Sequence, residues 1–201
     1  MTVATLRQLL DDATAGHHAV AGLVVLGWED ALAFTEAADE AGLPIVLQAG
    51  PGARRHTPVA VLGPMFRHLA EQARVPVACH IDHATTLEEC RAGIDHGFTS
   101  VMIDGSALPL DENIALTRSV VEVAAPAGVS VEGEVGFVGY AGGRASAFTT
   151  SATRLVYSGQ CSRPLLERVI FGERPNSAAT TTSVSSSLPV RSRSVIKALK
   201  A

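Results

Sequence analysis

The chain has 201 residues, of which 47% are hydrophobic and 4% aromatic, and its formal net charge is −4. This length allows one domain with an aliphatic core, but it is short for a complete (β/α)8 barrel, which takes about 250 residues. No signal peptide is recognised, no stretch reaches the roughly 20 apolar residues of a membrane span, and the cysteines are scattered, so we expect a cytoplasmic protein without a membrane partner.

Helical and strand-like patterns alternate over the first 134 residues. The helices are expected, in chain order, at 2–14, 28–41, 58–73, 85–96 and 110–125. The strands between them are expected at 18–26, 45–48, 75–80, 99–103 and 129–134. Because strands separated by helices specify a parallel sheet, residues 16–134 are predicted to form five parallel strands with four helices outside them.

The segment VACHIDHA at residues 77–84 is an apolar strand that ends in His80, Asp82 and His83. The carboxyl ends of strands form the active-site rim in parallel α/β proteins, so Asp82 and His83 are expected at a site of chemistry. A carboxylate beside an imidazole suits a metal ligand next to a general acid–base group. A structural alternative stays open, in which His80 caps the strand and Asp82 caps the following helix.

Two later strands also end in carboxylates. The segment SVMIDGS runs into Asp104, and SVEGEVG places Glu132 and Glu134 on one face of its strand. A carboxylate on an inward strand face is costly unless it is paired or bound to a metal. Such groups at the ends of consecutive strands favour one shared site over separate structural roles.

Residues 80–136 resemble the central block of the zinc-dependent (class II) ketose-bisphosphate aldolases over more than fifty positions. Residues 19–53 are similar to the first two units of the same family, so the resemblance covers residues 1–144. It implies an α/β fold of the TIM (β/α)8 type, here incomplete with about five βα units. It also implies a homo-oligomer, either a dimer or a tetramer.

The resemblance implies a role for each polar group at the strand ends. Asp82 would be the acid–base group that moves the proton during carbon–carbon cleavage. His83 would be one of three histidine ligands of a catalytic Zn²⁺, and Asp104 and Glu134 would hold the metal in an alternative position. The implied reaction is the reversible cleavage of fructose or tagatose bisphosphate to dihydroxyacetone phosphate and glyceraldehyde 3-phosphate.

Several positions depart from the family pattern. The resemblance implies two further zinc histidines after residue 134, but no histidine follows His96 in this sequence. Gly142 stands where the family has a proton-abstracting glutamate in a mobile loop. Val24 stands where the family has a substrate-contacting asparagine, and Gly50 stands where it has a serine after the second strand.

Basic residues occur in two groups. Arg54, Arg55 and His56 could attract a phosphate, and a solvated charge cluster is the alternative. Residues 191–200 are basic but lack interleaved aromatics and any nucleic-acid motif, so no nucleic-acid partner is expected.

The character of the chain changes after residue 144. Residues 1–144 hold 8 Arg and 18 acidic residues, a net charge of −10, whereas residues 145–201 hold 6 Arg, 2 Lys and 2 Glu, a net charge of +6. The sum is −4, the charge of the whole chain. The second region is rich in Ser and Thr, so we expect a low-complexity tail without a packed fold and disorder at 176–190.

Two classes of function stay open. In one, the chain is a metal-dependent aldolase that acts on a phosphorylated ketose and takes a missing ligand from a partner chain. In the other, it is a catalytically inactive homologue, either truncated or frameshifted near residue 144 or diverged into a pseudoenzyme. A frameshift would explain the tail, but it would not explain Val24, Gly50 and Gly142, which lie inside the matched region.

Overall fold

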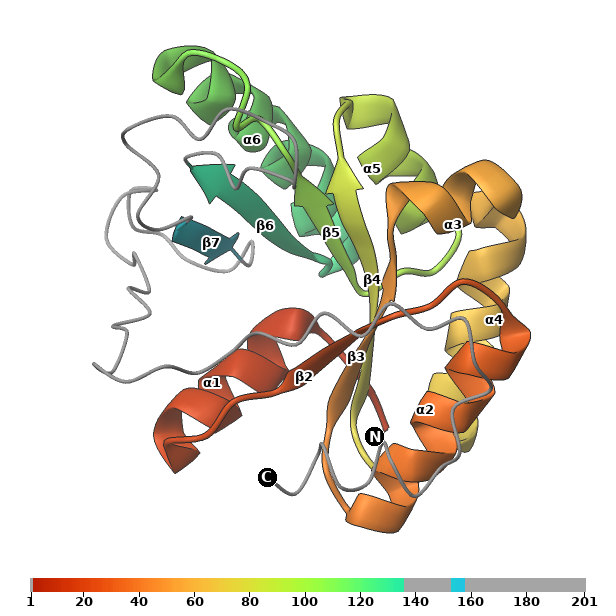
Figure 1. The fold of residues 1–201 in the computed structure, drawn as a ribbon. Helices are drawn as coiled ribbons and strands as arrows, with labels where there is room; N and C mark the ends of the chain where they lie inside the picture. The colour runs from red at the N-terminus through yellow and green to blue at the C-terminus, as the bar shows by residue number, and fades with distance from the viewer. Residues whose placement is uncertain (1, 136–152, 158–201) are drawn as a thin grey trace, which may run out of the picture.

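The computed structural model describes residues 2–135 and 153–157, which form an open, largely parallel sheet with helices packed against it (Figure 1). Its strands lie in the order β2-β3-β4-β5-β6-β7, and the short β1 pairs with β4 outside this path. They span Val3–Ala4 (β1), Ala21–Val24 (β2), Ile45–Ala49 (β3), Val77–Ala84 (β4), Ser100–Ile103 (β5), Ser130–Val135 (β6) and Thr153–Tyr157 (β7). Strands β2 to β6 are parallel neighbours, and β7 runs antiparallel to β6, so the predicted incomplete barrel is confirmed.

The helices divide between the two faces of the sheet (Figure 1). Those that follow the strands on the outer face are α2 (Trp28–Ala41), α3 (Pro51–His56), α4 (Val59–Gln72), α5 (Leu87–Asp95) and α6 (Leu110–Ala124), which ends in the 3-10 turn η1 (Ala125–Ala127). Phe66 of α4 and Val120 of α6 belong to the main core, together with the outward strand residues Leu47, Ile81 and Val101. Because side chains alternate along a strand, burial of these residues against the helices turns their neighbours toward the opposite, inner face.

Helix α1 (Leu6–Gly16) lies on the inner face instead. Its Leu6 and Leu9 pack with Val46 of β3 and Ala78 of β4 in a second, smaller apolar cluster. The cluster fills the inner face toward the amino ends of these strands, so the carboxyl ends are left for polar side chains.

The structure corrects several predicted element boundaries. The helix predicted from residue 2 begins at Leu6, because Thr5 and Gln8 form a capping box in which each side chain bonds the other's main-chain N–H. The preceding residues pair with β4 as β1. The strand predicted to end at His80 continues to Ala84, and the short helix α3 was not predicted.

Several predictions fall on residues that the structure leaves undescribed. The loop at Gly142, the segment 176–190 that was predicted to be disordered, and all of the 145–201 tail except β7 lie outside the described residues. Within the described part, every helix is too short or too polar to span a bilayer.

Helices α4 and α5 meet closely at Gly63. A Cβ added there would lie 2.0 Å from the carbonyl oxygen of His96, the residue that caps α5. We expect Gly63→Ala to lower the free energy of unfolding by about 1–3 kcal/mol through overpacking, although alanine is the better helix former. The matched control is Gly52→Ala, whose new Cβ would come no closer than 3.9 Å to Arg55. Urea unfolding followed by circular dichroism measures both, and equal stabilities would contradict the expectation.

Candidate active site

The inner face of the sheet carries a row of polar residues. The parallel register aligns Gln48, His80, Ser100 and Ser130 across β3 to β6. His80 is fully buried, and its Nδ1 lies 2.8 Å from the Ser100 hydroxyl. The predicted site residues lie next to this row, on the same face of the sheet.

Two predicted carboxylates, those of Asp82 and Glu132, lie next to this row and near the same nitrogen of the His80 ring. Nε2 of His80 is 3.7 Å from Asp82 Oδ1 and 3.7 Å from Glu132 Oε2. The structural alternative for Asp82 is not what the structure shows, because the residue that caps α5 is Thr86, whose hydroxyl accepts from the N–H of Glu89 at 3.2 Å. Asp82 therefore belongs to the polar inner face.

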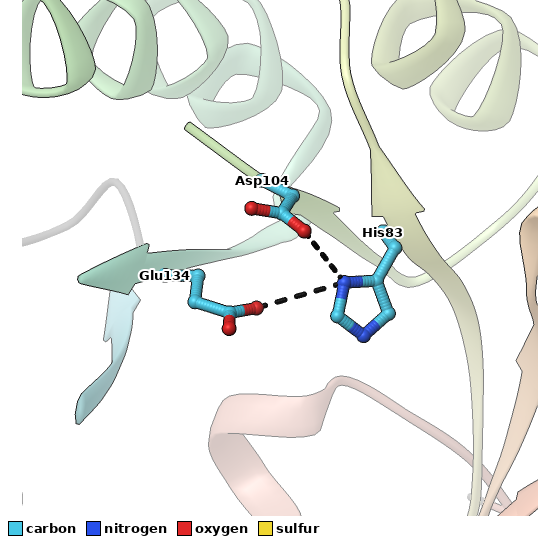
Figure 2. A group of neighbouring side chains, drawn as sticks. All are labelled: His83, Asp104 and Glu134. Carbon is cyan, nitrogen blue, oxygen red and sulfur yellow. Dashed lines mark hydrogen bonds and ion pairs between the residues drawn. The ribbon is translucent and has the colours of Figure 1, made fainter. Parts of the chain in front are cut away.

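His83, Asp104 and Glu134 converge at the carboxyl ends of three neighbouring strands (Figure 2). Nδ1 of His83 forms a 2.8 Å hydrogen bond with Asp104 Oδ2 and lies 3.6 Å from Glu134 Oε2. One ligand atom from each residue lies within 4.8 Å of the others. Zinc takes imidazole nitrogen and carboxylate oxygen as ligands, so this donor set fits part of a zinc shell.

A bulge at the end of β4 brings His83 to this side of the sheet. The pairing with β5 shifts register between Ile81 and Ala84, and His83 has a φ of 50°. In a regular strand Asp82 and His83 would point to opposite faces, because side chains alternate. The extra residue of the bulge lets both side chains reach the inner face. Bulges next to active sites commonly re-aim side chains in this way.

The Asp104 carboxylate is kept ionised by its neighbours. Burial alone would raise the pKa of Asp104, but hydrogen bonds from Ser106 and His83 outweigh it and hold that pKa below its usual value. The main-chain N–H of Ser106 donates to Asp104 Oδ1 at 3.1 Å, and its hydroxyl donates to the same oxygen. Sequence reasoning missed Ser106, although an aspartate followed by glycine is a recognisable turn signal, in which the aspartate side chain accepts from the main-chain N–H two residues on.

Asn113 supports the third member of the site in a similar way. It lies in α6 and is buried, and its Nδ2 donates to the main-chain oxygen of Glu134 at 2.7 Å. The bond ties the end of β6 to the helix that precedes it. This residue also went unnoticed in the sequence, because an asparagine inside an amphipathic helix carries no local signal of its partner.

Two buried thiols lie in the core behind the site. Burial raises the pKa of Cys79 and of Cys90 to about 12. Because only the thiolate is nucleophilic, we expect both to react with an aromatic disulfide near pH 8 at least about tenfold more slowly than in the unfolded chain. A Cys161→Ser variant isolates the two thiols, and timed titration with and without urea measures the difference. Fast reaction of both in the native protein would contradict this.

Comparison with known proteins gives concordant matches. The family model described as class-II fructose-bisphosphate aldolase matches residues 4–158, a range that runs past residue 144 and takes in β7. A fructose-bisphosphate aldolase of Geobacillus stearothermophilus is 40% identical over 142 residues, which is 69% of this chain and 50% of the relative. A 6-phospho-5-dehydro-2-deoxy-D-gluconate aldolase of Halalkalibacterium halodurans is 40% identical over 147 residues, which is 69% and 49%.

Solved structures agree. The YdjI aldolase from Escherichia coli K12 matches with a TM-score of 0.64 and 34% identity over 68% of this chain and 54% of that protein. The fructose-bisphosphate aldolase from Campylobacter jejuni matches with a TM-score of 0.58 and 26% identity, over 68% and 47%. The chain thus spans about half the length of the curated relatives that it matches.

Proposed function

Because this chain belongs to the class-II fructose-bisphosphate aldolase family, we propose that it carries the metal-binding and proton-transfer half of a ketose-bisphosphate aldolase site. The observation that carries the proposal is the convergence of His83, Asp104 and Glu134, with one ligand atom of each within 4.8 Å of the others. A phosphorylated ketose as substrate, homo-oligomeric assembly and a cytoplasmic location are parts of the same proposal, on the family resemblance.

In this proposal, His83, Asp104 and Glu134 hold Zn²⁺. When bound, such an ion acts as a Lewis acid toward the negative charge that carbon–carbon cleavage leaves on the substrate. The local charge supports a cation here, since Asp82 and Glu132 place two further carboxylates on the same inner face. Carboxylates gathered at a buried position repel one another unless a positive charge is shared among them.

Asp82 is the proposed acid–base group. Its Oδ2 lies 4.0 Å from Nε2 of His83, so the carboxylate stands beside the donor set. A general base has to be within hydrogen-bond reach of the proton it moves, directly or through one water. Ser100 holds the His80 ring through Nδ1. The other ring nitrogen, Nε2, lies 3.7 Å from Asp82 Oδ1, so the ring limits rotation of the Asp82 carboxylate.

A second candidate is a homologue that keeps the fold without turnover. Val24 favours it, because this residue is 53% exposed at the carboxyl end of β2, where the resemblance places a substrate-contacting asparagine. The absence of a histidine after His96 in the 201 residues points the same way.

A zinc titration followed by a coupled aldolase assay separates the two candidates. Fructose and tagatose bisphosphate serve as probes, and Asp82→Asn gives the background rate. Zinc-dependent cleavage above that background supports the aldolase, whereas cleavage equal to background with weakly bound zinc supports the inactive homologue. A titration in which zinc leaves the His83 signals unchanged would overturn the proposed metal site.

A further inference from the structure

A buried arginine donates hydrogen bonds to the main chain at the end of β4. Arg54 belongs to α3, and its side chain is 7% exposed, so it is not part of a solvated charge cluster. Its Nη1 donates to the carbonyl oxygen of Ala49 at 2.6 Å and to that of Asp82, and its Nη2 donates to the carbonyl oxygen of His83 at 3.1 Å. Two of these three acceptors belong to residues of the candidate site.

The protein compensates for burying this charge. Burial lowers the pKa of Arg54, and the neighbouring carboxylate of Glu89 works against that effect. Oε1 of Glu89 lies 3.8 Å from Nη2 of Arg54, while its Oε2 accepts from the N–H of Thr85 at 2.7 Å. Because Thr85 directly follows β4, Arg54 and Glu89 together bind the main chain at the end of this strand.

The Arg54 hydrogen bonds lie on either side of a residue with an unusual backbone conformation. The φ of 50° at His83 lies in the left-handed region, which residues with a side chain seldom adopt. The carbonyls of Asp82 and His83 belong to the two peptide planes on either side of the His83 Cα. Holding both oxygens therefore fixes the two main-chain dihedrals that set where the imidazole points.

We propose that Arg54 is a positioning residue, which holds the peptide planes around His83 so that its imidazole points at Asp104 and Glu134. Guanidinium suits this task because its planar fork of N–H groups can serve several carbonyls at once, which an ammonium group does less well. The consequence for metal affinity rests on the function proposed above, whereas the consequence for the His83 side chain does not.

Three variants of the 201-residue chain test the conformational part without metal. Arg54→Met removes the carbonyl bonds, Arg54→Lys keeps the charge but not the fork, and Arg55→Met removes the charge of an exposed neighbour on the same helix. The readout is the ¹⁵N NMR shift of the His83 ring, identified with His83→Gln. We expect both Arg54 variants to move these shifts toward those of a free imidazole, and Arg55→Met to leave them as in the parent.

Zinc affinity gives the second readout. Loss of a group that orients a metal ligand typically weakens binding about 10- to 100-fold, and we expect this of Arg54→Met, with only a minor recovery in Arg54→Lys. If Arg54→Met does not fold, judged by circular dichroism, Arg54→Lys decides. Parent-like His83 shifts in a folded Arg54 variant would overturn the inference, whereas a parent chain that binds no zinc would overturn only the proposed metal site.

Discussion

The purified 201-residue chain is expected to cleave fructose bisphosphate several decades more slowly than a full-length aldolase of the family. His83 supplies one imidazole, and the carboxylates of Asp104 and Glu134 are hard ligands that only partly replace two more. Loss of a firmly held Lewis acid raises the activation free energy by on the order of several kcal/mol, and each increase of about 1.4 kcal/mol slows the reaction about tenfold. The missing glutamate at Gly142 would remove about 100-fold more.

The measurement is a coupled assay across a zinc titration, with a full-length relative run in parallel. Tight, stoichiometric zinc together with normal cleavage would contradict the expected deficit and show that the donors in this chain suffice. A matched chimera joins residues 1–135 to the second half of the relative. Because Val24 and Gly50 remain in the chimera, we expect it to regain zinc binding before it regains full turnover, and equal recovery of both would show that these substitutions are harmless.

The parts of the fold that sequence patterns predicted are those with continuous apolar runs. Strands β3 and β5 are buried on both faces or nearly so, and short runs of aliphatic residues are typical of strands in that position. Helix α3 was missed because its Arg-Arg-His sequence reads as solvated charge, and only the folded structure shows that the carbonyl oxygens of Asp82 and His83 accept hydrogen bonds from Arg54. A buried cation whose acceptors lie 28 and 29 residues away leaves no periodic trace.

Some residues of the candidate site could likewise be placed from the sequence, and others could not. Strand alternation alone puts Glu132 and Glu134 on one face, and the end of a parallel strand puts Asp104 nearby. His83 is different, because alternation would turn it away from Asp82, and its inward direction depends on a positive φ at a residue that is not glycine. The resemblance to a family assigned His83 a role, but the bulge that makes the role possible is visible only in the structure.

Replacing His83 is expected to have the second large effect. Zinc sites in small proteins release about 10–16 kcal/mol over four ligands, so each accounts for about 2.5–4 kcal/mol, or about 100- to 1000-fold in affinity. His83 is the one nitrogen donor of the described cluster, and zinc binds imidazole more readily than it binds carboxylate. We therefore expect His83→Ala to reduce zinc affinity by at least about 100-fold, to the level of adventitious binding.

The control is His68→Ala, which removes an exposed imidazole from α4, where its ring centroid lies 6.3 Å from that of Trp28. Competition with a chelating dye measures both affinities, and circular dichroism verifies that both variants fold. Equal losses in the two variants would place the zinc elsewhere. We expect a large loss in His83→Ala, smaller losses in Asp104→Asn and Glu134→Gln, and none in His68→Ala. The reason is the donor set, in which one carboxylate can partly replace the other but no second nitrogen can replace the imidazole.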